Sequence, residues 1–75
     1  MRDTVLEVLK DHFGDKTFED NTNLVDELNA DEYDLVEVSI ILDEKLNISL
    51  DEEAILDIKT VGDLIKLVES NVQST

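Results

Sequence analysis

The sequence contains no cysteine and no proline, and among its 75 residues there are two glycines and one histidine. Without cysteine the chain has no disulfide, no thiolate metal site and no thiol nucleophile. A catalytic histidine needs a nucleophile or a metal beside it, and the sequence around His12 offers neither. We therefore expect His12 to be a surface residue near the end of a helix, and we expect no catalytic residue.

Basic residues are also scarce. Six lysines and arginines stand against 20 acidic residues, which gives a formal net charge of −14 at pH 7. This charge disfavours contact with nucleic-acid phosphates and with anionic membranes, because both need basic side chains. It favours basic protein partners, whose approach long-range attraction would steer. A solvated acidic surface that serves solubility is the alternative at this point.

No apolar stretch is long enough for a transmembrane helix, and the N-terminus has no signal-peptide pattern. We expect one domain over residues 1–75, a monomer in the cytoplasm without membrane insertion. No stretch has the spacing of a calcium loop, so no dedicated metal site is expected. Weak divalent-cation binding along Asp31, Asp34 and Glu37 is left open. The aliphatic residues are periodic, which favours a folded chain over a disordered one.

Helical periodicity predicts helices over residues 3–13, 32–46 and 60–71, and a short one over 51–56. Gly14 is a natural helix stop. Asp31 and Asp34 suit the start of the second helix, and Thr60 and Asp63 the start of the last. The final residues, 73–75, should fray. The predicted fold is all-α, a small four-helix bundle with three longer helices, one short helix and a long loop after the first.

The long loop, residues 15–31, is rich in residues that favour turns, yet it carries apolar side chains. We expect four of them to anchor the loop onto the helices: Phe18, Leu24, Val25 and Leu28. Asn29 suits a left-handed backbone conformation at the end of the loop.

The stretch Ala30-Asp31-Glu32-Tyr33-Asp34-Leu35-Val36-Glu37-Val38 resembles a segment of acyl carrier proteins, where the usual sequence is close to Ala-Asp-Ser-Leu-Asp-x-Val-Glu-Leu. Before it, Leu24-Val25-Asp26-Glu27-Leu28-Asn29 resembles the family's Phe-x-x-Asp-Leu-Gly. The likeness covers nearly the whole chain and is strongest over residues 28–42. It implies a non-catalytic carrier of acyl intermediates in fatty-acid, polyketide or related biosynthesis.

In that family the serine carries the 4'-phosphopantetheine arm, and the matching position here is Glu32. A carboxylate cannot replace the hydroxyl, because its attack would give an acyl phosphate that hydrolyses readily. Ser39 and Ser49 lie outside the loop-to-helix context. The chain as it stands should therefore carry no cofactor. A deliberate Ser→Glu change and a natural carrier-like paralogue that acts by binding alone both explain Glu32.

The resemblance also implies docking to basic surfaces of acyl synthases, acyltransferases and phosphopantetheinyl transferase through the second helix. The matching positions are Asp31, Tyr33, Asp34, Glu37, Ile40, Asp43 and Glu44. Taken without the resemblance, these acids form a solvated face with Tyr33 and Ile40 at the core edge. A second set matches the family's acyl-chain cavity and is otherwise ordinary core: Leu24, Val38, Leu42, Leu50, Ile55, Ile58, Leu64 and Leu67.

Two hypotheses follow for the function. The first is an acyl carrier protein blocked at Glu32. The second is an unmodified acidic binding module or regulatory subunit that uses the same helix. A mimic of nucleic acid that occupies basic proteins is a more distant third.

Overall fold

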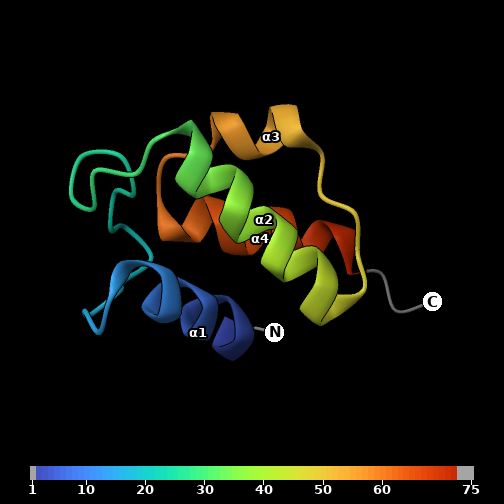
Figure 1. Ribbon diagram of the computed structural model, residues 1–75, viewed down its shortest axis with the longest axis horizontal. Coiled ribbons are helices and arrows are strands. Elements are labelled where there is room, and N and C mark those ends of the chain that lie inside the picture. Colours follow the sequence, from blue (N-terminus) through green and yellow to red (C-terminus); the bar gives the residue numbers. More distant parts are fainter. Residues whose placement is uncertain (1, 73–75) are drawn as a thin grey trace.

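The computed structural model describes residues 2–72, which form four helices and no strand. Helix α1 covers Arg2–Phe13, α2 covers Glu32–Leu46, α3 covers Glu52–Asp57 and α4 covers Val61–Asn71. Figure 1 shows α1 and α3 on opposite sides of α2, and each of them packs against both α2 and α4. The expected small all-α bundle, with one short helix and a long first loop, is confirmed. The expected fraying of residues 73–75 lies outside the described residues.

Capping residues fix where α2 and α4 begin. At α2, Asp31 Oδ1 accepts a hydrogen bond from the Asp34 backbone N–H at 2.9 Å, and Asp34 Oδ2 accepts one from the Asp31 backbone N–H at 3.1 Å. Thr60 and Asp63 form the same reciprocal pair at α4. Both caps were predicted, and α2 has the predicted bounds. Asp51 is the N-cap of α3 rather than its first residue.

The core is mainly aliphatic and draws on all four helices and the long loop. Its largest fully buried side chains are Leu9 from α1, Leu42 from α2, Ile55 from α3 and Leu64 from α4, together with Leu24 from the long loop. Burial of such side chains stabilises the fold by about 1.5–3 kcal/mol each. None of the helices in residues 2–72 is both long and apolar enough to cross a membrane.

The long loop is held against the junction between α3 and α4. The Leu24 N–H donates to the Lys59 carbonyl at 2.7 Å, and the N–H groups of Val61 and Gly62 donate to the carbonyls of Thr22 and Asp20 at 3.0 and 2.8 Å. A Cβ on Gly62 would lie 3.0 Å from the Asp20 carbonyl oxygen, so glycine allows this close approach. The loop therefore fixes the end of the bundle from which α2 starts.

Three of the four expected loop anchors are confirmed, and the prediction for the fourth, Val25, is wrong. Phe18 and Leu24 are buried and Leu28 is half-buried against the core, but Val25 is exposed. Residues 23–27 form a helical turn, with the Glu27 N–H donating to the Asn23 carbonyl at 2.9 Å. In such a turn positions 24 and 28 share a face, so Val25 points elsewhere. Asn29 and Gly14 have positive φ, 55° and 103°, as expected for residues that end a turn or a helix.

Candidate functional site

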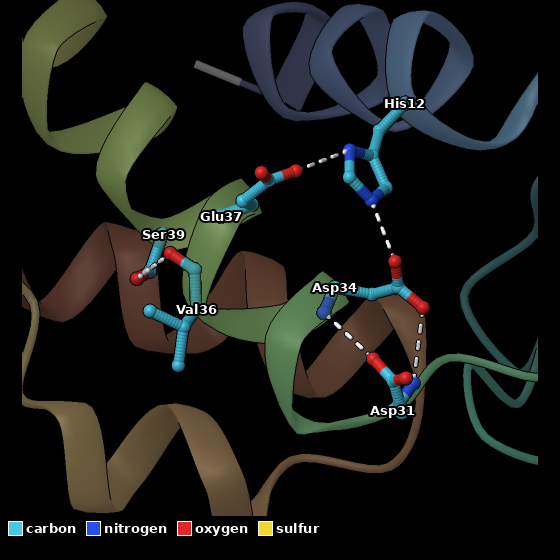
Figure 2. A network of polar contacts seen from close by, with 6 residues as sticks. All are labelled: His12, Asp31, Asp34, Val36, Glu37 and Ser39. Carbon is cyan, nitrogen blue, oxygen red and sulfur yellow. Dashed lines mark hydrogen bonds and ion pairs between the residues drawn. The ribbon is translucent and has the colours of Figure 1, made fainter.

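Glu32 is the first residue of α2 and is exposed to solvent. Among residues 2–72, its side chain has no hydrogen-bond or ion-pair partner. The position is therefore accessible, while its carboxylate supplies no hydroxyl nucleophile. Ser39 does not replace it, because Ser39 is buried and its Oγ–H donates to the Val36 carbonyl at 2.7 Å (Figure 2). Ser49 is exposed but lies in the loop between α2 and α3.

Beside Glu32, one stripe of α2 alternates apolar and acidic side chains. It consists of Tyr33, Glu37, Ile40 and Glu44, which we call the α2 stripe. Their spacing of four, three and four residues places them on one side of a helix. All are exposed, with 83% of Tyr33 and 50% of Ile40 accessible to solvent. An exposed tyrosine and isoleucine on a small domain give the stripe apolar contact area between its charges.

Asp34 and Asp43, two other residues predicted to meet partners, are also engaged inside the fold. Asp34 is half-buried rather than exposed, because it closes the α2 cap and its Oδ1 lies 3.0 Å from His12 Nε2. Asp43 Oδ1 accepts a hydrogen bond from the Leu50 N–H at 2.9 Å, which ties α2 to the loop that follows it. Asp31 is exposed and caps α2. The partner contacts of these acids remain predictions.

The expectation that His12 is a surface residue is wrong. Its side chain is 15% exposed and lies between α1 and α2, with Nε2 against Asp34 and Nδ1 3.6 Å from Glu37 Oε2 (Figure 2). The Phe13 ring packs edge-to-face on it at 4.8 Å. The signal was present in the sequence, since His12 follows Val5 by seven residues and continues the buried stripe of α1.

Two hydrogen bonds hold the pKa of the Asp34 carboxyl below its ordinary value of 3.8. The bond from His12 has the larger effect, and the bond from the Asp31 N–H has the next largest. A carboxyl whose pKa is lower in the folded than in the unfolded chain adds stability above its unfolded pKa, and loses it as the pH falls through its folded pKa.

Asp34→Ala should therefore reduce the free energy of unfolding by about 1 kcal/mol at pH 7, the usual cost of losing a helix-capping side chain. The difference from the wild-type chain should shrink as the pH falls below about 4. Urea unfolding followed by circular dichroism at pH 7 and at pH 3 measures both values. Glu44→Gln, an exposed change on the same helix, should stay within about 0.5 kcal/mol. A difference for Asp34→Ala that is the same at both pH values would contradict the role of its charge.

The eight residues predicted to line an acyl cavity all belong to the core or pack against it. Six are buried: Leu24, Val38, Leu42, Ile55, Ile58 and Leu64. Leu50 and Leu67 are half-buried against that core. The structure therefore brings them together between the helices, and an acyl-binding role for them remains a prediction. In the described part of the chain, no three acidic or histidine side chains are grouped so that they could hold a metal ion.

No model of a protein family matches the chain. Individual relatives do, and three are named acyl carrier protein. The one from Wolinella succinogenes is 38% identical over 52 residues, 69% of this chain and 68% of the relative. The one from Chlamydia caviae is 31% identical over 72 residues, 93% of this chain and 94% of the relative. The one from Helicobacter hepaticus is 38% identical over 50 residues, 67% of this chain and 66% of the relative.

Proposed function

We propose a function for this chain from its membership of the acyl carrier protein family, whose members are non-catalytic carriers in acyl biosynthesis. In this proposal the chain docks basic partner enzymes of that metabolism through α2, and it takes no phosphopantetheine at Glu32. The partners in this proposal are acyl synthases, acyltransferases and phosphopantetheinyl transferase. We further propose a cytoplasmic monomer, because a net charge of −14 opposes self-association.

The single observation that supports docking is the α2 stripe. It starts beside Glu32 and runs along an exposed side of α2. Its acids suit the steering of a basic partner, and Tyr33 and Ile40 suit the desolvated contact that holds it. Acids alone would form an ordinary solvated face, so the two exposed apolar side chains distinguish a docking surface from a merely soluble one.

Glu32 supports a second candidate, a binding module or regulatory subunit that uses the same stripe and never carries an acyl group. Its exposed carboxylate is well tolerated in the first helical turn, where an acid is favourable by about 0.3–1 kcal/mol. Both candidates share the docking surface. They differ in whether position 32 still lies in a site that a phosphopantetheinyl transferase can use.

Titration of the isotope-labelled chain with a carrier-dependent acyl synthase tests the docking surface. Amide chemical shifts should change most over residues 32–44, because contact perturbs the backbone of the helix that is covered. The exposed side of α1 around Glu7 provides the internal control. Changes centred on α1, or spread evenly over all four helices, would contradict docking through α2.

A further inference from the structure

His12 meets two carboxylates of α2 with its two ring nitrogens (Figure 2). Nε2 lies 3.0 Å from Asp34 Oδ1, and Nδ1 lies 3.6 Å from Glu37 Oε2. Helix α4 also packs against α1, but none of its described acids makes an ion pair with His12. On α1 itself the charged neighbours Lys10 and Asp11 are exposed. The acids that face the imidazole are thus Asp34, which belongs to the α2 cap, and Glu37, which belongs to the α2 stripe.

The two nitrogens respond differently to the loss of a proton. A neutral imidazole keeps one N–H, and Asp34 at hydrogen-bond distance retains it on Nε2. Nδ1 then presents a lone pair to the Glu37 carboxylate, and the two repel. A protonated imidazole has an N–H on both nitrogens and attracts Glu37 instead. The contact with Asp34 therefore survives in both states, while the contact with Glu37 exists in the protonated state alone.

Glu37 is free to respond because its side chain is 69% exposed, whereas Asp34 is held by the cap. No other histidine and no cysteine is present in the chain. Ordinary carboxyl groups titrate at lower pH and lysines at higher pH, so histidine is the side-chain type whose charge changes near neutrality.

We propose that His12 is a proton-controlled competitor for Glu37: when protonated it holds the Glu37 carboxylate against α1 and weakens the docking of a basic partner, and when neutral it releases Glu37 to that partner. This inference rests on the proposed docking through α2 and adds its regulation by pH. His12 acts through Glu37 and does not itself meet the partner.

Binding of a carrier-dependent acyl synthase at pH 5.5 and pH 7.0, at constant ionic strength, tests the regulation. From pH 5.5 to pH 7.0, the affinity of the wild-type chain should rise more than the affinity of His12→Gln. The difference between the two increases should be about two- to fivefold, the size expected for one exposed ion pair. The synthase titrates equally in both series, so the comparison removes its contribution.

Glutamine keeps an N–H for Asp34 and does not titrate. Glu69→Gln, which changes net charge on α4, should keep the wild-type response. Equal pH dependence of wild type and His12→Gln would overturn the inference.

A measurement without partner separates this inference from the docking proposal. The chemical shift of the Glu37 carboxyl carbon, followed by NMR from pH 5 to 8, should show a step. The midpoint of this step should equal that of the chemical-shift change of the His12 ring, and His12→Gln should lack the step. Absence of the step in the wild-type chain would overturn the switch and leave docking intact. If the step is present but Glu37→Lys leaves synthase binding unchanged, the docking proposal is overturned, and the regulatory role with it.

Discussion

Glu32→Ser should convert a chain that gains no phosphopantetheine into one that gains a single arm when it is incubated with coenzyme A and a broad-range phosphopantetheinyl transferase. The change is all or none, because a serine hydroxyl can lose its proton and attack the pantetheine-bearing phosphorus of coenzyme A. The P–O–P bond then breaks, adenosine 3',5'-bisphosphate leaves, and the product is a stable phosphodiester. Attack by the Glu32 carboxylate would instead give a labile acyl phosphate. Position 32 is exposed at the start of α2, so the new hydroxyl would be accessible. Intact-mass spectrometry of both proteins measures the result.

A control variant and peptide mapping complete this experiment. Glu32→Ala, which removes the carboxylate without adding a hydroxyl, should remain unmodified. A mass gain on the chain as it stands, mapped to Tyr33, Ser39 or Ser49, would contradict the assignment of position 32. Failure of Glu32→Ser to gain an arm while remaining folded would favour the unmodified binding module over the blocked carrier.

Ile40→Ala should speed dissociation from a carrier-dependent synthase by about tenfold, whereas Glu37→Lys should slow association by roughly three- to tenfold. An apolar anchor acts after contact, when its surface is desolvated, and its loss therefore changes mainly the off-rate. A charge at the edge of a contact acts during approach, so reversing it changes the on-rate and reduces its dependence on salt. Stopped-flow or surface-plasmon-resonance measurements at two salt concentrations separate the two effects.

Both variants should remain folded, because Ile40 and Glu37 are exposed. Circular dichroism and thermal unfolding check this directly. Val25→Ala is a matched apolar control, since Val25 is similarly exposed on the long loop, outside the α2 stripe. If Val25→Ala accelerates dissociation as much as Ile40→Ala, the apolar part of the docking surface is not confined to α2.

The helices could be predicted from the sequence because their determinants are local. In each of the two caps, Asp31–Asp34 and Thr60–Asp63, the two partners are three residues apart, and the apolar residues of each helix recur at helical spacing. The position of Glu32 followed from the same local pattern. Docking through Tyr33 and Ile40, which the family resemblance implies, requires both side chains to be accessible, and the structure places both at the surface.

The contacts between distant segments could not be predicted in the same way. His12 is 22 residues from Asp34, and their contact depends on how the last turn of α1 packs against the first turns of α2. The hydrogen bond from Leu50 to Asp43 depends on how the loop after α2 folds back. The apolar character of Val25 predicts an anchor, but the turn around Asn23 directs its side chain outward. Composition and periodicity carry no information on such pairings.

The association rate of Glu37→Lys, compared with that of Glu7→Lys, tests the central claim most directly. The two glutamates are matched, with side chains 69% and 67% exposed, and each reversal changes the net charge equally. Glu37 lies on the α2 stripe, and Glu7 lies on α1. If α2 is the docking surface, Glu37→Lys should slow association with a carrier-dependent acyl synthase several-fold more than Glu7→Lys does. Equal slowing by both reversals would mean that net charge alone governs binding, and would contradict docking through α2.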